Sequence, residues 1–162
     1  AQKKRVVERN TEALFHLFYM RAPYDEVMTA WRQHRADGYI DFDLEAVDGG
    51  GMTFLHHAAR EGYETILQDI LGLQEHQHLA NITTYASAKP NCWTALQCLA
   101  DKPKDSRTIQ QHASMAYYLV EHMTQEAVFN LTGNGTCVFH QLTARGHNET
   151  LEVLLRIVKN KS

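Results

Sequence analysis

A short phrase that returns at a nearly constant interval constrains this chain more than any other feature. Residues 51–63 are Gly-Met-Thr-Phe-Leu-His-His-Ala-Ala-Arg-Glu-Gly-Tyr, and residues 135–147 are Gly-Thr-Cys-Val-Phe-His-Gln-Leu-Thr-Ala-Arg-Gly-His. Residues 92–100 fit the same frame, and residues 13–19 fit it more loosely. The equivalent positions, 40, 41 and 43 residues apart, are His16, His56, Gln97 and His140. A period of this size is typical of stacked-repeat proteins, in which neighbouring units bury a shared core.

Each copy of the phrase contains the signals of a helix, a sharp turn and a second helix. Thr53 is placed to cap a helix beginning at Phe54, because its hydroxyl can accept an unpaired backbone N–H of the first turn. Gly62 suits a left-handed helix end, where a β-carbon would clash. Apolar residues then recur at i, i+1, i+4 and i+5 from Ile66 to Leu71, which predicts a second helix with one buried face.

The other units carry a similar apolar stripe. It contains Val27, Met28, Ala30 and Trp31 in the first unit, Met115, Ala116, Leu119, Val120 and Met123 in the third, and Leu151, Val153, Leu154, Ile157 and Val158 in the fourth. One helix pair is too small to bury such a face, so about three stacked units are needed. We therefore predict that these core residues are buried: Leu67, Ile70, Leu119, Leu154 and Ile157.

The phrase resembles the core of the ankyrin repeat, roughly Gly-x-Thr-Pro-Leu-His-x-Ala-Ala-x-x-Gly-His. The second unit matches at Gly51, Thr53, Leu55, His56, Ala58, Ala59 and Gly62. The fourth unit keeps Gly135, His140, Gly146 and His147; the third keeps Thr94, Leu96 and Ala100; the first keeps His16. The resemblance is strong over residues 48–72, fair over residues 133–158 and weak elsewhere. It implies that His16, His56 and His140 bond backbone groups of a neighbouring turn.

The chain also departs from the ankyrin pattern. The motif Pro is replaced in every unit, and the paired small Ala residues are present in the second unit alone, so the helix spacing is expected to be irregular. The period exceeds the roughly 33 residues usual for the family, so the connections must contain insertions.

Together these features predict a single all-α domain over residues 1–162. Its expected architecture is an α-solenoid of about four ankyrin-like helix pairs joined by long loops or short hairpin fingers. The four units span approximately residues 10–36, 48–73, 90–123 and 133–160. In the first unit we expect helices over residues 2–21, with or without a break near Asn10-Thr11, and over residues 24–35. Alternation of apolar residues with Asp in residues 36–50 predicts a short extended segment.

Composition narrows the range of functions. The formal net charge of −3 argues against a general nucleic-acid binder, which would have a basic face. No run of about 20 apolar residues is present, so no transmembrane segment is expected, although docking to a membrane complex stays open. Three Cys residues without close spacing favour free thiols in an intracellular, reducing compartment, either the cytosol or an organelle interior. Five Asn-x-Thr/Ser triplets would permit glycosylation on a secreted route, but Asn and Thr also gather at turns and caps.

The sequence contains no arrangement typical of catalysis or of a cofactor site. Nucleophile elbows, phosphate-binding loops and dinucleotide fingerprints are absent, so we expect no enzyme activity, no cofactor and no metal. Cys92, Cys98 and Cys137 lack the close spacing of structural zinc ligands. His76 and His78 could share a face, but the sequence supplies no third ligand.

The function expected from a stacked-repeat surface is protein–protein interaction, as an adaptor, scaffold or peripheral subunit of a larger assembly. The alternatives are a non-catalytic repeat segment of a larger enzyme or effector, and a structural subunit of a permanent complex. By register, the contact surface consists of finger tips and the exposed side of each first helix: Asp48, Met52, His57, Arg60, Glu61, Trp93, Asp101, Lys102, Gln141 and Arg145. Trp93 either anchors the partner, as aromatic side chains often do, or packs against the neighbouring finger.

Overall fold

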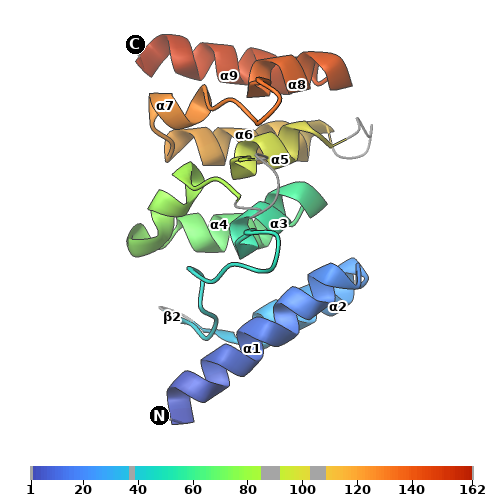
Figure 1. The fold of residues 1–162 in the computed structure, drawn as a ribbon, viewed down its shortest axis with the longest axis vertical. Coiled ribbons are helices and arrows are strands. Elements are labelled where there is room, and N and C mark those ends of the chain that lie inside the picture. The colour runs from blue at the N-terminus through green and yellow to red at the C-terminus, as the bar shows by residue number, and fades with distance from the viewer. Residues whose placement is uncertain (1, 37–38, 85–91, 103–108, 162) are drawn as a thin grey trace.

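A computed structural model describes residues 2–36, 39–84, 92–102 and 109–161 of the chain (Figure 1). These residues are predominantly helical, and the strand within them belongs to one short hairpin. The prediction of an all-α fold is therefore confirmed at the level of secondary structure.

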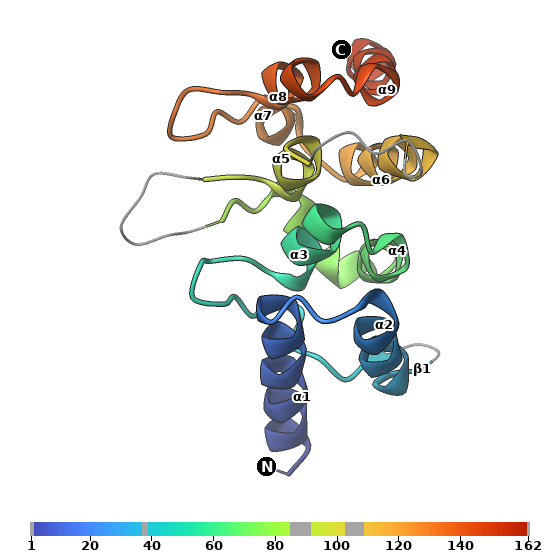
Figure 2. The same cartoon turned by 90° about the vertical axis from the view of Figure 1, so that its right-hand side faces the viewer.

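Most helices lie in pairs that follow one another along the long axis of the molecule (Figures 1 and 2). We call these pairs layers and number them from the N-terminus: α1 (Gln2–Tyr19) with α2 (Tyr24–Gln33), α3 (Phe54–Glu61) with α4 (Glu64–Leu71), α5 (Ala95–Ala100) with α6 (Ile109–Glu121), and α8 (Val138–Arg145) with α9 (Asn148–Lys161). Helices α3, α5 and α8 contact one another in that order, and α4, α6 and α9 form a second row. Each of the last three layers thus packs on its neighbour through both of its helices.

The connections between the layers contain shorter elements. Strands β1 (Arg35–Ala36) and β2 (Tyr39–Ile40) form an antiparallel hairpin, the 3-10 helix η1 (Gln74–Asn81) follows α4, and α7 (Gln125–Val128) follows α6. The hairpin overlaps the start of the connection predicted to contain an extended segment, residues 36–50, and Phe42 and Leu44 beyond the hairpin are buried. Neither η1 nor α7 was expected from the sequence.

The segment before each of the last three layers closes with the same backbone hydrogen bond. The N–H of Asp48 donates to Met52 O over 3.1 Å, that of Thr84 to Trp93 O over 2.8 Å, and that of Thr132 to Thr136 O over 2.9 Å. We call these three closures the finger bases. The middle finger is the longest, because Trp93 follows Thr84 by nine positions whereas the other two closures span four. The longer period predicted from the sequence is partly explained by this insertion.

A second repeated contact ties one layer to the next. Thr53 caps α3 in a reciprocal capping box with His56, whose Nε2 bonds Ile82 O at 3.0 Å and Trp93 O at 3.1 Å. In the next layer Gln97 completes the capping box of α5, and its Nε2 donates to Asn130 O over 2.8 Å and Thr136 O over 3.3 Å. The role predicted for His56 is confirmed, and an amide performs the same role in the next layer.

Three first helices end in the same left-handed turn. The N–H of Tyr63 bonds Ala58 O, that of His147 bonds Leu142 O, and that of Ala22 bonds Leu17 O. The left-handed residues before these donors are Gly62, Gly146 and Arg21, with φ of 85°, 74° and 53°. This equivalence shifts the first unit by one residue from the sequence frame, which paired His16 with His56. His16 is exposed, so the backbone-bonding role implied for it is wrong.

The predicted core is correct in the inner layers and less complete at the C-terminal end. Leu67, Ile70, Leu119 and Leu154 are fully buried, whereas Ile157 is half-buried on α9, which packs on a neighbouring layer on one side only among the described residues. In the first layer α1 continues through Asn10-Thr11 without a break, and α2 ends at Gln33. None of the helices described by the structure combines the length and apolar character needed to cross a bilayer.

Candidate functional site

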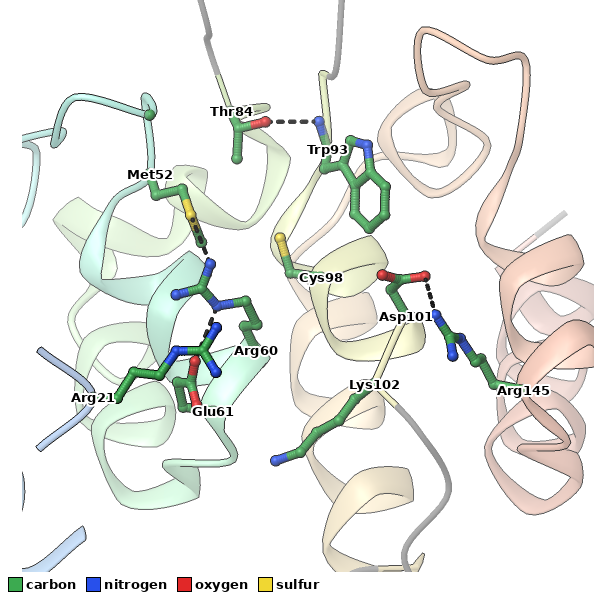
Figure 3. Close-up of a pocket in the computed structure, with 11 residues that line it drawn as sticks. Arg21, Met52, Arg60, Glu61, Thr84, Trp93, Cys98, Asp101, Lys102 and Arg145 are labelled. Carbon is green, nitrogen blue, oxygen red and sulfur yellow. Dashed lines mark hydrogen bonds and ion pairs between the residues drawn. The ribbon is translucent and has the colours of Figure 1, made fainter. Parts of the chain in front are cut away.

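A groove of about 650 Å³ runs along the second and third layers, between the finger bases and the ends of the first helices (Figure 3). Its described lining residues are Arg21, Gly50, Met52, Arg60, Glu61, Thr84, Trp93, Cys98, Asp101, Lys102 and Arg145. The groove is built by the repeat itself. Met52 and Trp93 each precede a helix-capping Thr, and the Arg60-Glu61 and Asp101-Lys102 pairs occupy equivalent positions at the ends of α3 and α5.

Asp48 organises the finger base beside this groove. Its Oδ1 accepts the N–H groups of Gly50 at 2.9 Å and Met52 at 3.0 Å, while Oδ2 accepts Nε2–H of His57 at 2.6 Å. Burial raises the pKa of the Asp48 carboxyl, but these hydrogen bonds and the nearby His57 outweigh it and hold the pKa below its ordinary value. Asp48 therefore remains an anion that fixes the position of Met52.

His57 lies beneath the groove rather than on its surface. The sequence placed it on the exposed side of α3, but its residue surface is 4% exposed. The cause is the preceding layer: Phe18 of α1 stacks on the imidazole with ring centroids 4.9 Å apart. Burial lowers the pKa of His57, although its hydrogen bond to Asp48 opposes this shift. His57 is therefore a structural support of the finger base, and its prediction as a contact residue is corrected.

Arg60 links three parts of the groove wall. Its Nε donates to Glu61 Oε1 over 3.1 Å, one terminal nitrogen lies 3.6 Å from Met52 Sδ, and the other lies 3.4 Å from His57 Nδ1. Because His57 donates Nε2–H to Asp48, its Nδ1 is free to accept from Arg60. The Arg60 guanidinium is thus oriented from the inside while part of it stays exposed to solvent.

The third and fourth layers form the opposite end of the groove. Arg145 of α8 pairs with Asp101 across 3.4 Å, so two layers are joined at this wall. Lys102 has no ion pair among the described residues, and its Nζ lies against Gly62, 3.1 Å from where a β-carbon would stand. Figure 3 shows its side chain extending from the end of α5 toward the α3 side.

Trp93 and Cys98 give the groove its apolar floor. Trp93 is half-buried at the middle finger base, where its backbone N–H donates to Thr84 Oγ1 over 3.1 Å. Cys98, in the second half of α5, lines the same groove (Figure 3). Burial raises the pKa of the Cys98 thiol to about 12, so this thiol is protonated at neutral pH and is a poor nucleophile.

The structure brings together seven of the ten residues that the sequence proposed as a contact surface. Those in the groove wall are Met52, Arg60, Glu61, Trp93, Asp101, Lys102 and Arg145. Asp48 supports the finger base, and His57 and Gln141 are buried. Gln141 is 6% exposed because it shares the register of His57, the helix side that faces the preceding layer. Its prediction as a contact residue is therefore corrected as well.

Sequence reasoning missed Arg21, which enters the groove from the end of the first layer. A signal was present, since Arg21 occupies a position that Gly62 and Gly146 occupy in the equivalent turns. The one-residue shift in the first unit concealed it. Loose similarity at a chain end is a weak guide to register, because terminal repeats are atypical.

The histidines considered as metal ligands meet a carboxylate instead. His76 Nδ1 lies 3.2 Å from one oxygen of Glu45, and His78 Nε2 lies 2.7 Å from the other. Within the ranges that the structure describes, no group of three or more His, Cys, Asp or Glu side chains is arranged to hold a metal ion. The expectations of no metal, no cofactor and no catalysis stay predictions.

Comparison with known proteins adds no family to this geometry. A scan against protein-family models finds no match to the chain, and a search of curated proteins finds no similar sequence. The resemblance to ankyrin repeats therefore stays a prediction.

Proposed function

We propose that the chain is an ankyrin-like helical solenoid that acts as a protein–protein interaction module, with its partner bound along the groove. The observation that supports this most is that seven positions of the repeated units line one groove. Repeated units place equivalent side chains in register, so such a wall spans several layers and suits an extended partner surface. A specific and stable complex would bury on the order of 1,200–2,000 Å² in total.

The composition of the groove also fits a protein partner. Met52 and Trp93 offer apolar and aromatic surface, and Arg60 and Arg145 offer guanidinium groups at the edge. Aromatic and Arg side chains are the residues that most often dominate binding energy at interfaces. The finger bases and buried capping boxes hold these groups in place, which lowers the entropic cost of binding.

Site-specific photocrosslinking tests this proposal. A photoreactive amino acid replaces Glu61 in the groove wall or, as the matched control, Glu152 on the exposed side of α9. In extract of cells that produce the protein, we expect a discrete crosslinked partner from position 61 and none from position 152. If the partner is another part of the same polypeptide, the crosslink is intramolecular, which would favour the alternative of a repeat segment in a larger enzyme or effector.

Alanine variants then locate the binding energy. Trp93→Ala and Arg60→Ala should each weaken the captured complex by about tenfold or more, whereas Arg156→Ala on α9 should leave it unchanged. Lys102 and Glu61 lie at the edge of the groove, so their substitution should alter association rate and salt dependence more than dissociation. If alanine substitutions in α1 or in η1 and its flanking connection weaken the complex while those in the groove do not, the groove is not the binding site.

A further inference from the structure

Arg21 adopts a backbone conformation that an arginine rarely has. It is the one non-Gly residue with positive φ, at 53°, among the residues described. The left-handed region places the β-carbon close to the following carbonyl, which is why Gly is the usual residue at such helix ends. The turns after α3 and α8 have the same hydrogen bonding and do contain Gly, at Gly62 and Gly146. Folding alone would favour Gly at position 21.

The Arg21 side chain is directed to the groove. It reaches toward Arg60 and Glu61 in Figure 3 and lines the cavity with them. Within the described residues Arg21 makes no ion pair, because Glu61 pairs with Arg60. An unfavourable backbone conformation at a functional surface is retained when the side chain it presents is needed there. The need at this position is a positive charge in the groove.

The groove as a whole carries more positive than negative charge. Its described lining contains four cationic side chains, Arg21, Arg60, Lys102 and Arg145, against two carboxylates, Glu61 and Asp101. Both carboxylates already have a cationic partner, so Arg21 and Lys102 are the surplus charges. This surplus lies in a chain whose formal net charge is −3, so cationic groups are concentrated at the groove against the balance of the molecule. A concave wall with one sign of charge attracts ligands of the opposite sign.

Apolar surface borders the same charges. Met52, Trp93 and Cys98 lie along the finger side of the groove, opposite Arg21 and Lys102 (Figure 3). The turn that carries Arg21 also exposes Tyr19 and Met20, whose surfaces are 82% and 62% accessible. An occupant that satisfies both features has carboxylates on one side and a large apolar side chain on the other.

We propose that the groove selects an extended acidic segment of a partner protein, with Asp or Glu side chains against Arg21 and Lys102 and an aromatic or large aliphatic side chain against Met52 and Trp93. This inference rests on the proposed interaction function and assigns its specificity. Arg21 is the determinant that the second and fourth layers lack, because Gly62 and Gly146 occupy the equivalent turns there.

A peptide-display experiment tests the specificity. A library of random peptides of about twelve residues, displayed on phage, is selected on the whole chain and on the Arg21→Gly variant. We expect the wild-type chain to enrich peptides with clustered Asp or Glu next to an aromatic or large aliphatic residue. A synthetic copy of an enriched peptide should bind about tenfold or more weakly to Arg21→Gly and to Lys102→Met, and should lose affinity as salt rises. Arg156→Ala removes one cation outside the groove and should bind like the wild type.

Thermal unfolding of the same variant separates specificity from folding. Because Gly adopts the left-handed turn without strain, Arg21→Gly should melt about 2–4 °C higher than the wild type while it binds less well. A side chain retained for structure would give the opposite result, a lower melting temperature. We therefore expect the Arg21→Gly variant to gain thermal stability and to lose binding of the acidic peptide.

Three outcomes would overturn the inference. These are enriched peptides without an acidic preference, equal binding of the acidic peptide by Arg21→Gly and the wild type, and a library that yields no binder to the groove. A lower melting temperature for Arg21→Gly would also overturn it, since Arg21 would then have a structural role. The photocrosslink from position 61 does not depend on the charge of the partner, so the proposed interaction function can stand when this specificity fails.

Discussion

The second and fourth layers share the same sequence phrase but not the same environment. Thr53 with His56 and Cys137 with His140 begin their helices alike, and Gly62 and Gly146 end them in the same left-handed turn. His56 is fully buried and bonds two backbone carbonyls of the connection to the third layer, whereas His140 is exposed and bonds the cap residue Cys137. The phrase thus specifies a helix, a turn and a second helix wherever it occurs, and the following layer decides which side chains are buried.

The second helices show the same contrast. In α4, Ile70 is fully buried between neighbouring layers, while in α9 Ile157 is half-buried and Leu155 is exposed. Stability in stacked repeats is approximately a sum of unit terms and interface terms between neighbours. Among the described residues the fourth layer has one such interface and the second has two, so the same apolar residue should contribute more in the second layer.

The largest expected effect compares two isoleucines. Ile70→Ala should lower the free energy of unfolding by about 2–5 kcal/mol, because a fully buried side chain leaves a cavity. Ile157→Ala should cost less than half as much, since Ile157 retains contact with solvent in the folded chain. Urea denaturation of the two variants beside the wild type measures both changes. Equal costs would show that the fourth layer is packed as tightly as the second, which would contradict the contrast drawn here.

The next effect is a loss of stability at acidic pH, and it comes from His56. Burial disfavours the charged imidazole and lowers the pKa of His56 to about 4, although hydrogen bonds to Ile82 and Trp93 partly oppose this. An unfolded histidine has a pKa near 6.5. Between these values the unfolded chain binds a proton that the folded chain does not, so stability falls as pH falls from about 6.5 to 4. The loss due to His56 should be about 3 kcal/mol at pH 4.

A substitution borrowed from the third layer isolates this contribution. His56→Gln should keep the capping box and the tie to the next finger base, because Gln97 makes both in α5. Chemical denaturation across the pH range should then show a shallower acid loss than in the wild type. The acid loss of stability that remains in this variant includes a contribution from His112, because burial lowers the pKa of His112 to about 4 as well. An acid loss in His56→Gln as steep as that of the wild type would contradict the assignment to His56.

Local signals explain how much of this fold was predictable. Thr53 and Thr94 cap their helices as residue type and spacing indicate, and Gly62 and Gly146 end α3 and α8 in the expected conformation. These features depend on a few neighbouring residues, so one sequence contains them. The helix α7 and the 3-10 helix η1 were missed because each lies in a connection without a long periodic pattern.

The sequence could predict which repeat positions line the candidate groove, but it could not predict which of their side chains are exposed. Periodicity identified the positions of Arg60, Trp93 and Lys102, because equivalent residues of stacked units lie along one face. It placed His57 on the surface because it could not show that Phe18 of α1 covers this imidazole. Arg21 was missed for the same reason: its position depends on how the first layer ends against the second, a contact between segments far apart in sequence.

The smallest expected change in stability comes from a comparison of two buried glutamines in neighbouring layers. Gln97 is buried between the third and fourth layers, and its amide bonds Thr94, Asn130 and Thr136. Gln141 of α8 is also buried, but its Oε1 has no hydrogen-bond partner in the part of the chain described. A buried unpaired carbonyl costs free energy, so Gln141→Met should raise the free energy of unfolding by about 1 kcal/mol or less. Gln97→Met should lower it by about 1–3 kcal/mol, because three backbone groups would lose their partner. Urea denaturation of both variants gives changes of opposite sign if hydrogen-bond partners decide whether a buried amide stabilises the fold. Destabilisation by Gln141→Met would show instead that its amide contributes through a contact of its own.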